Sequence, residues 1–460
     1  MKSALSAPPE WGVEPVPDRL RVLSTFDTGA LWGNLGISLL LPIVAAFMVP
    51  AMSFRQALAA IAVGVVVGNL MLGYAGKIGA ETGAPAMVLY RPALGLRGSY
   101  VPTLLNILQN VGWGSFELLI IGTAAAAISS EVFGVGLRPV WTVLFGALVT
   151  LMAVWGPLGV VRAWIRRYAV WLVLVATVYL TFEVLRRGGL GSALSAPATG
   201  GLPFWRGVDL VIAMPISWVP LVQDYTRFSR TPRAGFAGTA LGYGIAHAWL
   251  YVLGALLVLS GLATNPTDPN AFVAAILAIP VFGILALGIL AVDESDEAFA
   301  NVYSASVSIQ NVFPRVSQQK LSIGIGAVCT VIAMAVDLVQ YESFLFLIGA
   351  VFVPLFGILA ADYAVVARRY RPDDLWGPGP PVRAWAIVAW VAGFLAYNWI
   401  NPGLISWWKG AMESLFDALR FPEAPSWLAA SLVSFAVAFG LQSLKALRRD
   451  RSPAPAAASA

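Results

Sequence analysis

The sequence contains one cysteine and one histidine among its 460 residues, Cys329 and His247. A lone cysteine cannot form a disulfide framework, and a single histidine beside it cannot supply the clustered ligands of a zinc site. Charged residues are also scarce, at 12% of the chain. This composition argues against most thiol and metalloenzyme chemistries.

The amino-terminal segment has no apolar core. Its sequence, MKSALSAPPEWGVEPVPDRLRVL, is polar and proline-rich, whereas a signal peptide needs a short hydrophobic stretch before its cleavage site. We therefore expect residues 1–25 to form a cytoplasmic segment that is not a signal peptide.

Apolar residues, by contrast, are abundant. They make up 58% of the chain, and the mean hydropathy of +0.77 is typical of an all-α integral membrane protein that crosses the bilayer many times. Twelve apolar runs predict twelve transmembrane helices, at residues 26–50, 54–76, 101–129, 140–155, 168–185, 208–226, 236–263, 279–308, 321–338, 344–366, 385–400 and 427–447.

If both termini are cytoplasmic, most of the 29 lysine and arginine residues lie in segments on the cytoplasmic side of the membrane. This bias predicts a multi-pass protein of the plasma membrane with that orientation. The net positive charge then reflects orientation and does not indicate nucleic-acid binding. Residues 384–447 hold the last two helices, and the basic, alanine-rich residues 448–460 are expected to be a disordered cytoplasmic tail.

Two of the twelve runs contain helix breakers. The first run carries Gly33, Gly36 and Pro42, and the sixth carries Pro215 and Pro220 around Ser217 and Trp218. Proline removes a backbone donor and glycine tolerates unwinding, so both helices should expose backbone groups inside the membrane. A matched pair of broken helices five spans apart indicates an inverted-repeat transporter. The two repeats would be residues 26–186 and 207–367.

The eighth run contains four carboxyl groups. Each would cost about 2.5 kcal/mol or more at mid-depth in a bilayer unless it faces protein, water or a cation. A solvated loop is the alternative, but the apolar lead-in and the lack of turn residues favour an uninterrupted helix, and ion coupling is the use it suggests. At about 100° per residue, one arc of that helix holds Asp293, Glu294, Glu297, Asn301 and Ser304, with Asp296 on its flank.

The third run has a polar and aromatic stripe. Its spacing aligns Asn106, Gln109 or Asn110, Trp113 and Glu117 on one helical face. An indole ring offers a stacking surface, and the amide and carboxylate groups offer hydrogen bonds, so the face could hold a small planar heterocycle. Alternatively, Trp113 packs against lipid or a neighbouring helix and Gln109 joins helices.

Several motifs resemble the nucleobase:cation symporter family 1, the purine/cytosine permease family. They are ETGAPAMVLYRPALGLRGSYVP, QNVGWGSFELL, SWVPLVQDYTRFSR, AFANVYSASVSIQNVFPRV and ADYAVVARR. The resemblance implies a LeuT-type fold of ten core helices in two inverted repeats plus two further helices. It also implies import of cytosine, hydroxymethylpyrimidine or a purine through alternating access.

The resemblance also implies the site residues. Trp113 matches the stacking tryptophan, Glu117 stands where some members have glutamine, and Asn301 matches a substrate-binding asparagine. The identity of the second stacking residue is left open. It could be Trp218, or it could lie at the position of Met214 or Pro215. The full set of expected substrate residues is Trp113, Glu117, Gln109, Asn110, Ser217, Trp218, Asn301, Asp293 and Glu297.

The resemblance also implies a cation site between the first and eighth helices. The matching positions are Asn34, Ile37, Val292, Ser295 and Asp296. Asp296 departs from the family, which often has a neutral hydroxyl residue there, so the coupling ion could be Na⁺ or H⁺. No other cofactor is expected, and we expect the lipid-embedded protein to function as a monomer.

There are two alternative functions, and the second comes from a different functional class. An amino-acid or other solute carrier on the same fold would need a site for both a carboxylate and an amine, whereas the carboxyl and tryptophan groups here suit a planar, N–H-rich base better. A membrane-embedded enzyme would need a metal cluster or an activated nucleophile, and the sequence offers neither.

Overall fold

The computed structural model describes residues 12–160, 165, 168–188, 190–261, 268–279, 282–337 and 341–449. Within these ranges the chain forms helices and no β-strand beyond an isolated bridge between Leu23 and Ser229. The described chain is therefore all-α, as predicted. Residues 1–11, and residues 450–460 of the tail predicted at 448–460, lie outside the described residues. Arg448 and Arg449, which the prediction placed in the tail, belong to the last helix.

The helices follow one another along the chain with short connections. They are α1 (Thr25–Asn34), α2 (Leu41–Met48), α3 (Phe54–Thr82), α4 (Arg91–Leu94), α5 (Tyr100–Phe133), α6 (Arg138–Trp155), α7 (Pro157–Val160), α8 (Val170–Gly188), α9 (Leu190–Ser195), α10 (Phe204–Trp218), α11 (Gln223–Thr226), α12 (Thr239–Leu259), α13 (Pro269–Leu277), α14 (Gly283–Val312), α15 (Gln318–Ala335), α16 (Tyr341–Ala361), α17 (Pro372–Trp376), α18 (Ala384–Ile400), α19 (Ser406–Ala418) and α20 (Ala430–Arg449). Shorter helical turns are η1 (Asp18–Leu20), η2 (Ala86–Tyr90), η4 (Ala234–Gly238) and η5 (Asp362–Val366).

Seven helices among the described residues are long and apolar enough to cross a membrane by themselves. They are α3, α5, α6, η4 with α12, α15, α16 with η5, and α20. The first and sixth predicted spans are each divided, into α1 with α2 and α10 with α11, and the eighth, α14, carries four carboxyl groups. The number of twelve spans stays a prediction, as does the division into repeats.

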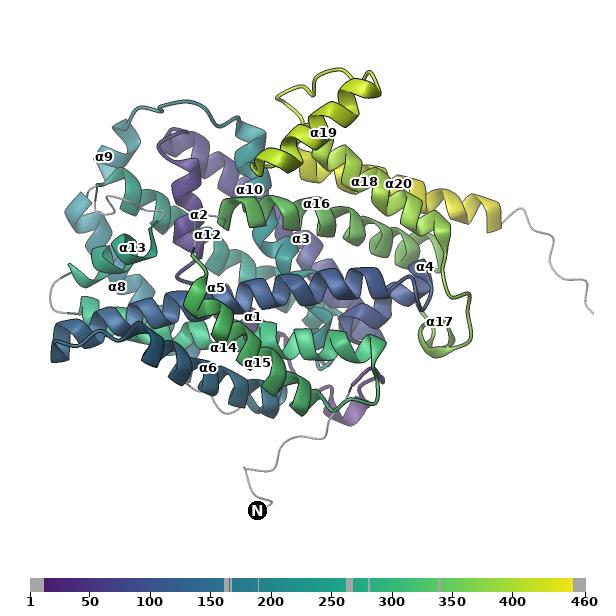
Figure 1. Cartoon of the computed structure of the whole chain (residues 1–460), viewed down its shortest axis with the longest axis horizontal. Helices are drawn as coiled ribbons and strands as arrows, with labels where there is room; N and C mark the ends of the chain where they lie inside the picture. The colour runs from purple at the N-terminus through teal and green to yellow at the C-terminus, as the bar shows by residue number, and fades with distance from the viewer. Residues whose placement is uncertain are drawn as a thin grey trace, which may run out of the picture.

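Two long helices, α5 and α14, run side by side through the middle of the molecule (Figure 1). They are the third and eighth predicted spans. The polar stripe of one and the acidic run of the other therefore lie in the core.

Helix α3 packs closely against α10 through two glycines. A Cβ atom at Gly64 would lie 2.5 Å from the Cβ of Val211, and one at Gly68 would overlap Pro215. Small residues allow such close approach of membrane helices. This contact holds the broken helix α10 in place from one side.

Helices α16, α18 and α20 form a layer along one edge of the molecule (Figure 1). The buried Asp209 of α10 accepts hydrogen bonds of 2.9 Å from the backbone N–H groups of Ala430 and Ser431. These groups lie at the start of α20, where helical N–H groups have no intrahelical partner. The last helix is thus anchored to α10.

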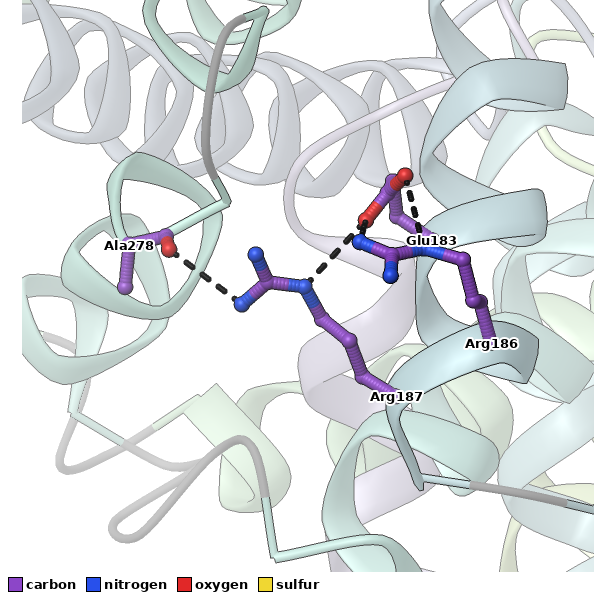
Figure 2. Close-up of polar contacts among 4 residues, drawn as sticks. All are labelled: Glu183, Arg186, Arg187 and Ala278. Carbon is purple, nitrogen blue, oxygen red and sulfur yellow. Dashed lines mark hydrogen bonds and ion pairs between the residues drawn. The ribbon is translucent and has the colours of Figure 1, made fainter.

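A charged cluster ties the end of α8 to α13 (Figure 2). Glu183 accepts hydrogen bonds from Arg186, at 2.8 and 3.2 Å, and from Arg187 at 3.2 Å. Arg187 also donates to the carbonyl of Ala278 at 3.3 Å. This carboxylate is paired with arginines at a helix end.

Candidate functional site

The first helix break separates α1 from α2 and lies against α14. At this break the hydroxyl of Ser38 and the backbone N–H of Leu39 each donate to Glu294 at 2.7 Å. Leu39 precedes α2, so the carboxylate of Glu294 accepts a backbone N–H that the helix leaves unpaired and lies at the favourable end of its dipole.

The end of α1 contacts the next carboxyl groups of α14. The Asn34 side-chain amide donates to Asp293 at 2.8 Å and to Asp296 at 2.9 Å. Both carboxyl groups are buried. A single amide therefore bridges two acidic side chains, and the predicted acidic run forms an uninterrupted helix inside the protein.

The second break separates α10 from α11 and lies against α5. The amide of Gln109 donates to the Ser217 carbonyl at 2.9 Å, and the amide of Asn106 donates to the Pro220 carbonyl at 3.1 Å. Because Pro220 has no N–H, it interrupts the helical ladder. The polar stripe of α5 supplies donors to carbonyls that the break exposes.

Between these breaks lies a small cavity, with about 230 Å³ of space that is not filled by atoms. Its walls come from α5, α10 and α14. The lining residues are Trp113, Glu117, Met214, Ser217, Trp218, Glu297 and Asn301.

A carboxylate and an amide face each other in this cavity. The side-chain nitrogen of Asn301 lies 3.0 and 3.1 Å from the two oxygens of Glu117. The bond joins α14 to α5 in a buried setting, where hydrogen bonds are electrostatically stronger than in water. The two helices predicted to bind the substrate therefore contact each other directly, through Glu117 and Asn301.

Two tryptophan rings also line the cavity, and other aromatic residues contact them. Trp113 lies edge-on to Tyr341 and Phe344 of α16, with ring centroids 5.7 and 5.4 Å apart. The Trp218 N–H donates to the hydroxyl of Tyr243 at 2.9 Å. Trp218 thus lines the cavity and its ring position is fixed by a buried hydrogen bond.

Three predicted substrate residues do not line the cavity. Gln109 is buried beside it and supports the Ser217 carbonyl. Asn110 is also buried, and neither polar atom of its side chain has a hydrogen-bond partner among the described residues. Asp293 lies at the first break, bonded to Asn34. Direct contact of these side chains with a substrate stays a prediction.

The predicted cation positions come from the first break and from the acidic part of α14. The carbonyl of Asn34 accepts the N–H of Ile37 at 3.0 Å, and the buried Ser295 hydroxyl has no partner in the described part of the chain. Val292 differs from these, since its side chain is 39% exposed, so only its backbone could serve. Among the described residues, no three His, Cys, Asp or Glu side chains converge to hold a metal ion. A cation site here would therefore combine backbone, hydroxyl and carboxyl oxygens.

A family model described as a permease for cytosine/purines, uracil, thiamine and allantoin matches residues 15–413. The chain belongs to this permease family. The permease is 26% identical over 408 residues to the hydantoin permease of Microbacterium maritypicum, covering 84% of this chain and 83% of the relative. It is 27% identical over 355 residues to the cytosine permease of Escherichia coli strain K12, covering 74% and 78%.

Solved structures match the whole permease. A nucleobase-cation-symport-1 family transporter in a closed conformation, with bromovinylhydantoin bound, matches with a TM-score of 0.75 at 21% identity, covering 97% of this chain and 96% of that one. A Na⁺-coupled sialic acid symporter matches with a TM-score of 0.58 at 12% identity, covering 92% and 89%. These matches confirm the predicted fold class. Family membership also confirms a transporter rather than an enzyme.

Sequence reasoning missed part of this site. Tyr341 and Phe344 begin α16, and their contacts with Trp113 depend on how that helix packs. No periodic pattern in the sequence indicates such a contact. The sequence gives a weak indication of the contact between Ser38 and Glu294. The backbone groups of a broken helix need hydrogen-bond partners, and the carboxyl groups of a membrane helix need hydrogen-bond donors.

Proposed function

We propose that this permease imports a nucleobase or related planar heterocycle by symport with a cation. The substrate would be cytosine, hydroxymethylpyrimidine or a purine, and the ion Na⁺ or H⁺. The protein would act as a monomer in the plasma membrane, with both termini in the cytoplasm. The single observation that carries the proposal is the small cavity in which the Glu117–Asn301 pair lies beside Trp113.

The cavity supports a planar substrate because its polar and aromatic groups converge there. Trp113 offers a ring for stacking, and Glu117 with Asn301 offers hydrogen bonds at one edge. The predicted neighbours, Gln109 and Ser217, hold the backbone of the second break beside this edge. A flat heterocycle would thereby be fixed in both orientation and depth.

Coupling would act through α14, since this helix contacts the first break and also lines the cavity. One part of it contacts Asn34 through Asp293 and Asp296, and the next turn carries Asn301 to the cavity. A cation bound at Asn34, Ile37, Val292, Ser295 and Asp296 would order the same helix that binds the substrate. Each ligand should then raise the affinity of the other by the same factor. Rocking of one repeat against the other would open the cytoplasmic side.

Uptake into proteoliposomes tests the proposal. Labelled cytosine, hydroxymethylpyrimidine, uracil and a purine are offered with Na⁺ and proton gradients imposed separately, and liposomes without protein serve as the control. Uptake of at least one base that depends on one gradient is expected. Uptake of amino acids in place of every base would favour the other solute carriers of this fold and contradict the proposal.

A further inference from the structure

The hydrogen-bond donors around the cavity are largely engaged within the protein. The side-chain nitrogen of Asn301 contacts both oxygens of Glu117, at 3.0 and 3.1 Å, and also the backbone carbonyl of Glu297 at 3.1 Å. An amide nitrogen carries two hydrogens, so these acceptors occupy both of them. Asn301 has no hydrogen left to offer a substrate in this arrangement.

The other polar walls follow the same pattern. The hydroxyl of Ser217 donates to the Met214 carbonyl at 2.6 Å, and the indole N–H of Trp218 donates to Tyr243 at 2.9 Å. Only the indole N–H of Trp113 is a buried donor without a partner among the described residues that line the cavity. The walls therefore offer a substrate few hydrogens.

Acceptors, in contrast, remain available. The Oε1 atom of Glu297 is buried and receives no hydrogen bond from the described residues. Glu117 binds one amide group in the cavity, whereas a carboxylate can accept about four hydrogen bonds. No lysine, arginine or histidine is among the described residues that line the cavity. Buried acceptors of this kind need donors, and a bound substrate can supply them.

From this imbalance we infer that the cavity selects heterocycles with a donor-rich edge, such as amino-substituted or protonated aminopyrimidines, over imides, and that Glu297 determines this preference. The inference rests on the proposed function and narrows its substrate class. An imide presents carbonyl oxygens that would face the carboxyl oxygens of Glu117 and Glu297, with no hydrogen between them. An amino group in the same position supplies that hydrogen.

A series of pyrimidines of equal ring size tests the preference. The number of N–H groups rises, and the number of carbonyls falls, from uracil through cytosine to 2,4-diaminopyrimidine. Each compound is offered separately to proteoliposomes and its uptake is measured by mass spectrometry. We expect uptake efficiency to rise along the series, with uracil at least about tenfold below cytosine, the factor that one charge-assisted hydrogen bond provides.

Variants at position 297 test the assigned residue. Glu297→Gln keeps one oxygen and adds an N–H₂ donor, so the ratio of cytosine to uracil uptake should fall about tenfold. Glu297→Asp keeps a carboxylate and should retain part of the preference. Glu131→Gln removes an exposed carboxylate near the end of the same α5 that carries Glu117, and should leave the ratio unchanged. Size-exclusion profiles establish that each variant is folded.

The possible outcomes separate this inference from the proposed function. Uptake of uracil or hydantoin with no uptake of cytosine or 2,4-diaminopyrimidine would overturn the inference and leave nucleobase-like transport intact. An unchanged cytosine-to-uracil ratio in folded Glu297→Gln would also overturn it. If no heterocycle entered the liposomes under either gradient, the proposed function and this inference would fail together.

Discussion

At the first helix break the backbone exposes N–H donors, whereas at the second it exposes carbonyl acceptors. The donor of Leu39 is met by the carboxylate of Glu294, and the acceptor of Ser217 is met by the amide of Gln109. Each partner comes from one of the two long central helices, α14 in one case and α5 in the other. The two breaks therefore require partners of opposite polarity.

This difference suggests a separate role for each break, cation binding at the first and substrate binding at the second. Carboxyl groups at the first break supply oxygen atoms that can bind a cation or a proton. Neutral amides at the second break fix the backbone without adding charge, which suits an uncharged or donor-rich ring beside it. The cavity lies where the two environments meet, since Glu297 and Asn301 of α14 line it together with α10.

Removing the carboxylate at the first break should have the largest effect. In Glu294→Ala, the Leu39 N–H and the Ser38 hydroxyl lose their acceptor, at a cost of about 1–3 kcal/mol for each buried donor. We expect a large fall in the thermal unfolding temperature in detergent, together with loss of uptake. In Glu294→Gln, the amide oxygen can still accept from Leu39 and the hydroxyl of Ser38 can accept from the amide, so most stability should return. Equal stability of Glu294→Ala and wild type would contradict the role of this bond.

A second prediction concerns the cavity itself. Glu117→Ala removes the partner of Asn301 and one of the two cavity carboxyl groups. Uptake of an aminopyrimidine should fall about 100-fold, the upper range for a lost charge-assisted hydrogen bond. Expression and the unfolding temperature should change little, because the cavity can admit water. Unchanged uptake by Glu117→Ala would remove this residue from the substrate site.

The coupling ion gives the third prediction. Asp296→Asn keeps the size of the side chain and removes its charge beside Asn34. Stimulation of uptake by the cation gradient should fall about tenfold, whereas substrate binding without the gradient should stay close to wild type. Uptake measured with and without the cation gradient gives the stimulation, and equilibrium binding of labelled substrate gives the affinity. Full retention of the cation dependence would place the coupling site elsewhere and weaken the contrast between the breaks.

Much of this arrangement could be predicted from the sequence because it depends on local chemistry. Proline and glycine positions gave both breaks, and helical spacing placed Glu117 and Trp113 on one face. The acidic run of α14 had to be buried against donors, since its helix is flanked by apolar residues. These inferences depend on periodicity and on the cost of polar groups in lipid, and both are visible in one chain.

The remaining features depend on tertiary packing and could not be predicted. The relative depth of two helices decides which amide donates to which carbonyl, as in the hydrogen bond from Asn106 to the Pro220 carbonyl. The contact of Tyr341 with the cavity residue Trp113 depends on the rotation of α16. Asp293 was grouped with the substrate residues by its helical arc, yet its side chain contacts Asn34 at the first break. A helical wheel gives direction about one axis and says nothing of neighbouring helices.

The smallest expected effect belongs to the amide at the second break. Gln109→Met has a similar length but donates no hydrogen bond, so the Ser217 carbonyl loses its side-chain partner. A neutral hydrogen bond contributes about 1 kcal/mol, so the half-saturating substrate concentration should rise about fivefold and the cation dependence should not change. Kinetics of uptake across substrate concentrations, with the gradient fixed, measure both quantities. A loss of cation dependence in Gln109→Met would mean that the second break also takes part in coupling, and the division between a charged break for the ion and a neutral break for the substrate would then be wrong.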